Sequence, residues 1–367
     1  MIIENGLVFQ EDGSYQKEPV YIEEGKIVSS YEEVCDKTII DASGLKVIPG
    51  LIDIHSHGAF GHDFSDGSVD GLKTILKYQK EHGITSYCPT SMTLGIDVLE
   101  HIFGTANKVG NDKKQARIVG LNMEGPFLDP SKKGAHLEQY IVHLSSDFFD
   151  HCQKASHGMI KLVTVAPNAQ GAMDFIREKH NEVHISLGHT AATYDCCMEA
   201  FRAGADHVTH LFNAMPPYSH RSPGLVGAAS DAEHCYVELI SDGIHIHPSV
   251  IRSAFKMFPE RVVLISDSMM ATGMENGTYE LGGQQVTVTD GKATLENGTI
   301  AGSATNLFDC MKKAISFGVP EKDAIFAATK HPAMSIGIFD EVGSISVGKR
   351  ADILLVTPDF ALKQVIS

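Results

Sequence analysis

The sequence predicts an α/β protein, a TIM-type (β/α)8 barrel joined to a small β-sandwich that both ends of the chain build. Three observations support this fold class. Eight short apolar runs alternate with stretches of helical period through the middle of the chain, which is typical of a buried parallel sheet. Both ends consist of short strand-like runs and turns. Histidines or carboxylates stand at the ends of six of the eight apolar runs, where such a barrel forms its functional face.

The terminal segments predict the sandwich. Strand-forming residues there alternate with turn signals such as Asp12-Gly13 and Glu24-Gly25. Near the N-terminus we expect strands at 6–9, 20–23, 26–29 and 38–41, and the run 351–356 has the same character near the C-terminus. We therefore expect residues 1–48 and 341–367 to form the sandwich and residues 49–340 to form the barrel.

The barrel strands are the near-continuous apolar runs between these segments. They cover residues 47–54, 84–88, 118–123, 161–165, 182–187, 206–210, 235–240 and 262–266. Helical period is clear at 71–82 and 191–203, between consecutive runs. Eight such units favour a closed barrel over an open sheet. After the eighth run, strand-like pieces at 277–281, 285–288 and 292–295 predict a β-hairpin insertion near 277–297.

Composition and charge exclude several classes of partner. The 367 residues are 43% hydrophobic and 21% charged, as expected for a soluble globular protein with a large core. With 46 acidic and 30 basic residues the formal charge is −16, which argues against nucleic acid or an anionic membrane as a partner. A phosphorylated small molecule stays compatible with this charge, because a few local cations can bind it.

The cysteines, the N-terminal residues and the lengths of the apolar runs predict a cytoplasmic protein. Seven scattered cysteines form no disulfide framework. The N-terminal residues lack the basic and apolar segments of a secretion signal. No run approaches the ~18 consecutive apolar residues that a membrane span requires.

Histidines and carboxylates at the strand ends predict a metal centre. In chain order they are Asp53, His55, His57, Glu124, His189, His210, His245 and Asp267. Because the carboxyl ends of barrel strands meet at one mouth, these distant residues converge. Any single histidine among the 19 is readily explained as structural, but the coincidence at six strand ends favours metal binding. Imidazole and carboxylate ligands suit zinc, iron or manganese.

Several motifs resemble those of a known family. His55-Ser56-His57 after an apolar strand, with Gly348-Lys349-Arg350-Ala351-Asp352 near the C-terminus, resembles the amidohydrolase superfamily. Many members bridge two metals with a carboxylated lysine, whereas here Met123-Glu124-Gly125-Pro126-Phe127 offers a glutamate. That glutamate is similar to the one in N-acetylglucosamine-6-phosphate deacetylases, as are the motifs at 133–136, 187–190, 209–215, 242–245 and 265–269. The resemblance covers nearly the whole chain.

This resemblance implies a role for each site residue. Glu124, His189 and His210 match the main metal ligands. His55 and His57 match a second metal position, so one or two divalent ions (zinc, iron, manganese or cobalt) are expected per chain. Asp267 matches the catalytic acid/base. The positions that match substrate contacts are Ala135, His136, Asn213, Ala214, Arg221, His245, Ile300, Ala301 and Gly302.

The reaction that the resemblance implies is hydrolysis of the acetamido group of N-acetyl-D-glucosamine 6-phosphate to D-glucosamine 6-phosphate and acetate, by a homodimer. A bound divalent metal lowers the pKa of its water toward ~7, and Asp267 would act as general base and then general acid. The metal and His136 would polarise the acetyl carbonyl. Arg221 offers a bidentate fork for the phosphate.

Two other functions stay open. The chain could be an amidohydrolase for another N-acyl or cyclic amide substrate, in which case Arg221 and His245 would have no phosphate to bind. It could instead be a silent metal-binding barrel used in assembly or regulation. Asp267 argues against the silent barrel, because a protein without catalysis needs no acid/base at that position.

Overall fold

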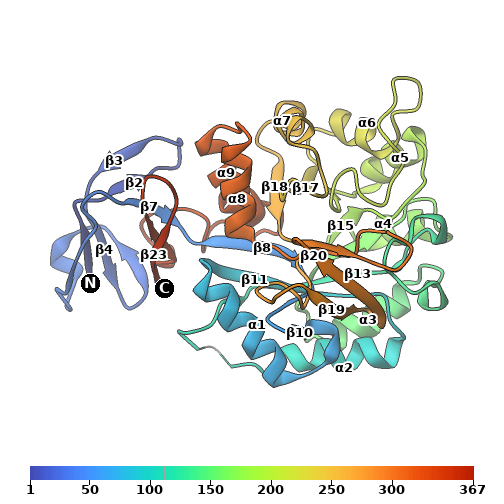
Figure 1. The fold of residues 1–367 in the computed structure, drawn as a ribbon, viewed down its shortest axis with the longest axis horizontal. Coiled ribbons are helices and arrows are strands. Elements are labelled where there is room, and N and C mark those ends of the chain that lie inside the picture. Colours follow the sequence, from blue (N-terminus) through green and yellow to red (C-terminus); the bar gives the residue numbers. More distant parts are fainter. Residues whose placement is uncertain (111) are drawn as a thin grey trace.

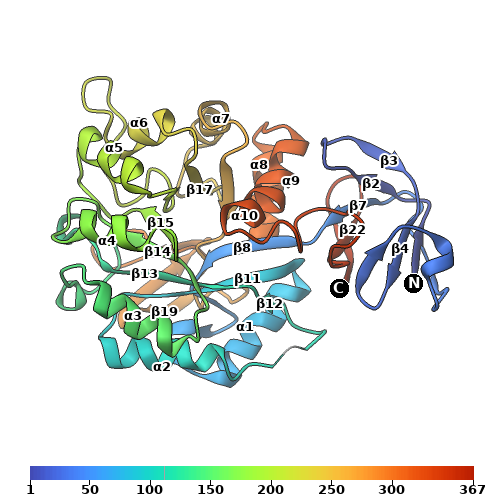
Figure 2. The ribbon, with the colours of Figure 1, turned by 180° about the vertical axis from the view of Figure 1, so that it is seen from behind.

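The computed structural model describes residues 1–110 and 112–367, and it consists of a barrel with a smaller β-sandwich at its side. Both chain ends lie in the sandwich (Figure 1). Seen from behind, helices pack around the outside of the barrel strands (Figure 2). The predicted fold class is confirmed.

The barrel contains eight parallel strands that neighbour one another in chain order. They are β8 (Leu51–Ser56), β11 (Ile84–Ser91), β13 (Leu121–Phe127), β14 (Ile160–Val165), β15 (His184–Leu187), β16 (His207–Val208), β17 (Tyr236–Ile240) and β18 (Val262–Ile265). The first and last strands meet at the carboxyl end of the barrel, where the Asp267 N–H donates to the His55 carbonyl oxygen at 3.0 Å. The ring of strands therefore brings the first and last sequence motifs together.

Helices lie between successive strands or follow the last one, and they cover the outer face of the barrel. They are α1 (Val69–Glu81), α2 (Ile96–Ala106), α3 (Ser146–Ala155), α4 (Ala172–Lys179), α5 (Tyr194–Ala203), α6 (Gly224–Asp231), α7 (Pro248–Met257), α8 (Leu307–Ser316), α9 (Glu321–Ala328) and α10 (Lys330–Ser335). Helix α1 shows why they form: the Ser68 side chain caps it by accepting from the Gly71 N–H. Leu72, Ile75 and Leu76 then recur at helical spacing and are buried.

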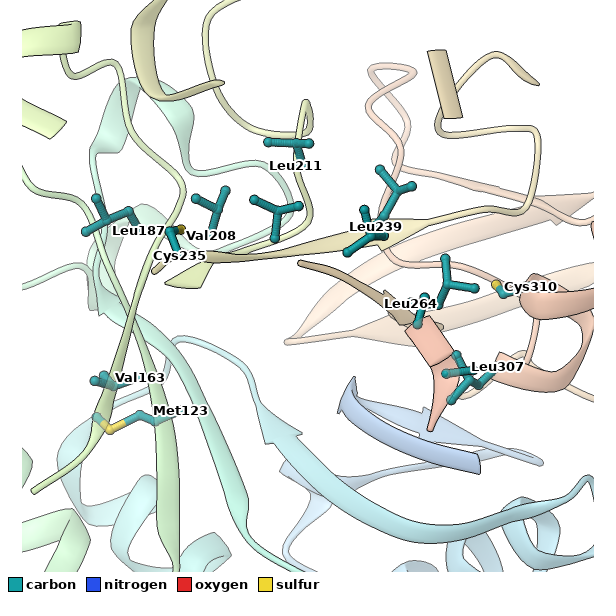
Figure 3. Close-up of a cluster of buried hydrophobic side chains, with 14 of the residues drawn as sticks. Met123, Val163, Leu187, Val208, Leu211, Cys235, Leu239, Leu264, Leu307 and Cys310 are labelled. Atoms are coloured by element: carbon teal, nitrogen blue, oxygen red, sulfur yellow. The ribbon is translucent and has the colours of Figure 1, made fainter. Parts of the chain in front are cut away.

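An apolar layer between strands and helices fixes the strand ends in place. Because side chains alternate along a strand, Met123 joins this layer while its neighbour Glu124 does not. Figure 3 shows Leu264 of β18 beside Leu307 and Cys310 of α8. Each fully buried leucine contributes about 1.5–3 kcal/mol relative to an exposed one. This packing holds the strands whose ends carry the candidate site.

Both ends of the chain build the sandwich, as the sequence predicts. One sheet has the order β5-β4-β1-β6 and the other β23-β22-β7-β2-β3. Their strands are β1 (Ile2–Glu4), β2 (Leu7–Phe9), β3 (Tyr15–Lys17), β4 (Val20–Glu23), β5 (Lys26–Val28), β6 (Ile39–Asp41), β7 (Lys46–Pro49), β22 (Ile353–Val356) and β23 (Leu362–Ile366). Val8, Ile22 and Ile353 belong to the buried core of this part. The chain division at 48/49 and 340/341 stays a prediction.

Two expected strands are wrong as single units. The run 47–54 contains β7 of the sandwich and β8 of the barrel, with Gly50 between them. A Cβ at Gly50 would lie 2.2 Å from Thr85 Oγ1, so only glycine fits at this change of sheet. The run 118–123 likewise divides into the short β12 (Arg117–Ile118) and β13, which continues through Glu124.

The insertion after β18 has three strands, one more than a hairpin. They are β19 (Gly277–Leu281), β20 (Gln284–Thr289) and β21 (Lys292–Thr294), paired antiparallel in that order. Leu281 and Val286 pack with Met92 and Ala135 over the mouth of the barrel. The Gln284 side chain donates to the Ala135 carbonyl, next to His136.

The remaining elements are short. They are the strands β9 (Gly58–Ala59) and β10 (His62–Asp63) and four 3₁₀ turns at Tyr31–Glu33, Phe64–Asp66, Pro130–Lys132 and Glu138–Tyr140. Within the described part of the chain, no helix combines the length and apolar character needed to cross a membrane.

Candidate active site

Five predicted metal ligands and Asp267 form one buried cluster at the carboxyl ends of the strands. His55 and His57 lie at the end of β8, Glu124 lies in β13, and His189 and His210 follow β15 and β16. Asp267 comes two residues after β18. Strand topology alone brings these residues together from across more than half the chain.

Glu124 is the centre of the cluster because its two carboxylate oxygens face different histidines. Oε1 lies 3.1 Å from His189 Nε2 and 3.0 Å from His210 Nε2, and these two nitrogens are 3.0 Å apart. Oε2 lies 3.2 Å from His57 Nε2 and 3.6 Å from His55 Nε2. The geometry is that of two adjoining groups of donor atoms that share one carboxylate.

Asp267 lies beside the His55 and His57 group. Its Oδ1 is 3.3 Å from His57 Nε2 and 3.8 Å from His55 Nε2. The backbone φ of Asp267 is 48°, and His189 and His210 also have positive values of 44° and 27°. Such conformations are uncommon outside glycine and cluster at functional sites. The unusual backbone directs these side chains toward one another.

Hydrogen bonds donated by Nδ1 determine which ring nitrogen faces the centre in three of these histidines, while Nδ1 of His210 is buried without a hydrogen-bond partner among the described residues. His57 Nδ1–H donates to the Thr90 carbonyl at 3.1 Å, and His189 Nδ1–H donates to the Lys132 carbonyl at 2.8 Å. His55 Nδ1–H donates to Glu238 Oε2 at 2.9 Å. These bonds direct Nε2 of each of the three rings toward Glu124. His55 Nε2 is buried and has no hydrogen-bond partner among the described residues.

The electrostatics of the cluster suit a divalent cation. Burial raises the pKa of Glu124, but His55 and His136 outweigh this effect and hold it well below its usual value. Burial also lowers the pKa of His189 to about 4, so its ring is neutral at pH 7. Neighbouring carboxylates, Glu238 and Glu124 for His55 and Asp267 and Glu124 for His57, outweigh burial and raise the pKa of both rings, and a divalent cation would displace these protons. A carboxylate and imidazoles in contact are the donor set that zinc, iron, manganese and cobalt accept. The residues present therefore fit such a cation.

His136 differs from the other histidines in its hydrogen bonding. Its Nε2 lies 3.4 Å from Glu124 Oε2, within reach of the donor atoms. However, its Nδ1 accepts the Thr93 N–H at 3.2 Å, so the ring proton must be on Nε2. His136 thus presents an N–H donor to the centre, which suits a substrate oxygen better than a cation.

Other predicted substrate contacts lie around this cluster. The Ala214 carbonyl accepts from the Thr190 N–H at 3.2 Å, and the Asn213 side chain donates to the His210 carbonyl at 3.2 Å. Beside Asp267, Ala301 and Gly302 precede Ser303, whose N–H donates to the Asp267 carbonyl at 2.7 Å. These loops are tied to the backbone of the cluster residues themselves.

Among the described residues, no hydrogen bond or ion pair joins three of the predicted residues to the cluster. His245 is held by Asp242, with 2.8 Å between Nδ1 and Oδ2. Ile300 is half-buried beside Ala301. Arg221 is exposed in the loop between β16 and α6, and within the described residues no carboxylate pairs with it. The strand-end Asp53 contacts the cluster only through backbone, because it accepts from the His55 N–H at 3.3 Å and from Ser266 Oγ at 2.6 Å.

Sequence reasoning missed two carboxylates that hold histidines. Asp242 orients His245, and Glu238 contacts His55 from β17. Glu238 is the one charged residue in an otherwise apolar strand interior, Val237-Glu238-Leu239-Ile240. A charged residue at a position predicted to be fully buried is the signal that could have identified it.

Comparisons with known proteins show which family the chain resembles. The Amidohydrolase family matches residues 46–367. An N-acetylglucosamine-6-phosphate deacetylase from Bacillus subtilis is 35% identical over 365 residues, covering 98% of this chain and 90% of the relative. An N-acetylgalactosamine-6-phosphate deacetylase from Escherichia coli O157:H7 is 33% identical, covering 86% of this chain and 85% of the relative.

A solved structure shares the fold throughout. It is a mutant N-acetyl-D-glucosamine-6-phosphate deacetylase from Mycobacterium smegmatis in complex with N-acetyl-D-glucosamine-6-phosphate. The TM-score is 0.91 at 29% identity, with 100% of this chain and 97% of that chain covered. Together with the family match and the full-length relatives, this similarity shows that the chain belongs to the amidohydrolase family.

Proposed function

We propose that this protein hydrolyses the acetamido group of N-acetyl-D-glucosamine 6-phosphate, yielding D-glucosamine 6-phosphate and acetate. The observation that carries the proposal is the buried cluster in which both Glu124 oxygens face histidines and Asp267 lies beside them. The similarity to deacetylases of this substrate over nearly the full chain supports the same reaction. The activity is that of a hydrolase acting on a linear amide.

The cluster residues would hold one or two divalent cations. We propose Glu124, His189 and His210 as one set of ligands. His55 and His57 would complete a neighbouring set through the second oxygen of Glu124. Zinc, iron, manganese and cobalt all fit these donors. When bound, such a cation supplies Lewis acidity that makes water a usable nucleophile near neutral pH.

Asp267 would transfer the proton, and His136 would stabilise the negative charge that develops on the acetyl oxygen. The hydrogen bond from His57 and the charge of His55 outweigh burial and lower the pKa of Asp267, so it is a carboxylate at neutral pH. It can therefore accept the proton of the attacking water and pass it to the departing nitrogen. His136 Nε2–H would donate to the acetyl oxygen as negative charge develops there.

We further propose that the phosphate is bound by Arg221, His245 and the backbone N–H groups of Asn213 and Ala214. The exposed guanidinium of Arg221 is free for a bidentate contact with phosphate oxygens. Ala135, Ile300, Ala301 and Gly302 would line the sugar side of the site.

We also propose that the protein works as a cytoplasmic homodimer in which one subunit supplies part of the phosphate site of the other. The family resemblance and the exposed position of Arg221 support this arrangement. The seven cysteines are free thiols, which fits a reducing compartment. Sedimentation equilibrium should give twice the chain mass, and a monomer would contradict the proposal.

A substrate panel tests the proposed function against its alternative, an amidohydrolase for another N-acyl or cyclic amide. Metal-loaded protein should release acetate from N-acetylglucosamine 6-phosphate far faster than from N-acetylglucosamine. Equal rates on the two sugars would contradict a phosphate site. Faster turnover of N-acetylgalactosamine 6-phosphate, or of an N-acyl amino acid, would assign a different substrate.

A further inference from the structure

Glu238 is a carboxylate buried directly behind the candidate metal ligands. It lies in the middle of β17 and is 0% exposed, while its neighbours Val237 and Leu239 join the apolar layer behind the strand. In the described part of the chain, its one ion-pair contact within 4.0 Å is with His55. No lysine or arginine there neutralises it.

One oxygen of Glu238 contacts two separate segments, the end of β8 and the residues after β16. Oε2 accepts from His55 Nδ1–H at 2.9 Å and from the His210 backbone N–H at 3.1 Å. The other oxygen, Oε1, is buried without a hydrogen-bond partner among the described residues. Glu238 thus contacts His55, which faces Oε2 of Glu124, and His210, which faces Oε1.

An isolated buried charge is costly unless opposite charge lies nearby. The open Nε2 of His55 lies on the far side of the ring from Glu238, 3.6 Å from Glu124 Oε2. Carboxylates that accept the second N–H of a metal-bound histidine fix its tautomer and raise its basicity. A cation at His55 Nε2 would therefore account for both the buried charge and the open nitrogen.

We propose that Glu238 is a positioning residue of the metal site: it holds His55 with Nε2 directed at the cation and anchors the backbone at His210. The inference rests on the proposed function only in taking these histidines as cation ligands. Glu238 touches no substrate position and acts through His55.

The test measures binding of Co²⁺ alone, whose visible absorption reports the ligands around it. Glu238→Gln keeps an acceptor for both N–H groups but removes the charge, whereas Glu238→Met removes the acceptor as well. We expect Glu238→Gln to weaken Co²⁺ binding roughly 10- to 100-fold, as for other outer-shell carboxylates, with a changed spectrum. Glu238→Met should weaken it further.

Ser241→Ala is the matched control. Ser241 is a buried polar residue at the end of the same strand, and its Oγ donates to the Cys310 carbonyl at 2.7 Å. This variant should bind Co²⁺ as the unaltered chain does. Circular dichroism checks that Glu238→Gln is folded; an unchanged Co²⁺ affinity and spectrum in that folded variant would overturn the inference.

A double-mutant cycle with His55→Ala shows whether Glu238 acts through this histidine. Once His55 is absent, Glu238→Gln should produce little further loss of Co²⁺ affinity. An equal loss with and without His55 would also overturn the inference. A chain that passes both tests but leaves N-acetylglucosamine 6-phosphate intact would contradict the proposed function alone.

Discussion

Replacing Asp267 with asparagine should stop the proton transfer while leaving the site otherwise intact. The carboxylate Oδ1 lies 3.3 Å from His57 Nε2, and an amide oxygen in the same place keeps that contact. The φ of 48° at Asp267 is one that asparagine adopts more readily than alanine, so the backbone should not shift. The bonds from Asp267 N–H to His55 and from Ser303 N–H to Asp267 involve backbone carbonyls and persist.

The expected loss follows from the role of the carboxylate. A positioned general acid/base contributes ~10²–10⁴-fold, which corresponds to about 2.7–5.5 kcal/mol of activation free energy. Turnover of Asp267→Asn should therefore fall by at least ~100-fold, while direct binding of intact substrate should survive. Acetate release should be compared at matched metal content, because loss of the carboxylate could also lower occupancy.

Asp206→Asn is the matched control for this change. Asp206 also faces a histidine, with 2.6 Å from Oδ2 to His184 Nδ1, but it precedes β16 at the opposite end of the barrel. Its variant should turn over at the normal rate. Near-normal turnover of Asp267→Asn at matched metal content would show that another group moves the proton.

Three further predictions concern metal, phosphate and the acetyl oxygen. The double variant His55→Ala, His57→Ala should lose about one equivalent of metal by elemental analysis; unchanged content would remove the second position. Arg221→Ala should weaken binding of the phosphorylated sugar by one to two decades, since charge-assisted hydrogen bonds contribute roughly 1.5–3 kcal/mol each. An equal loss of binding for the unphosphorylated sugar would mean that Arg221 has a structural role instead. His136→Ala should lower kcat about 10²–10³-fold, as removal of an oxyanion donor does, at unchanged metal content; loss of metal would make His136 a ligand.

The barrel and its buried cluster could be predicted because both follow from strand periodicity and topology. Parallel strands place His55, Glu124, His189, His210 and Asp267 at one mouth regardless of their separation in sequence. In the structure, histidines face both oxygens of Glu124. The roles assigned to the individual residues stay predictions until they are tested.

Other features depend on contacts that a single sequence does not reveal. The apolar run across Pro49-Gly50 gives no sign that two sheets meet there, because the close approach of Thr85 causes the break. The hydrogen bond from His55 to Glu238 joins residues 183 positions apart. The sequence shows a lone carboxylate in an apolar strand, but it does not show which residue that carboxylate contacts. The tautomer of His136 depends on a hydrogen bond from the backbone N–H of Thr93. A backbone contact of this kind cannot be predicted from a sequence motif.

Product analysis tests whether the protein deacetylates N-acetylglucosamine 6-phosphate. Metal-loaded protein should produce one acetate and one free amine for each sugar phosphate consumed. Removing the metal with a chelator should abolish this turnover, and adding a divalent metal back should restore it. Intact substrate after prolonged incubation with metal-loaded protein, or full turnover after verified metal removal, would contradict metal-dependent deacetylation.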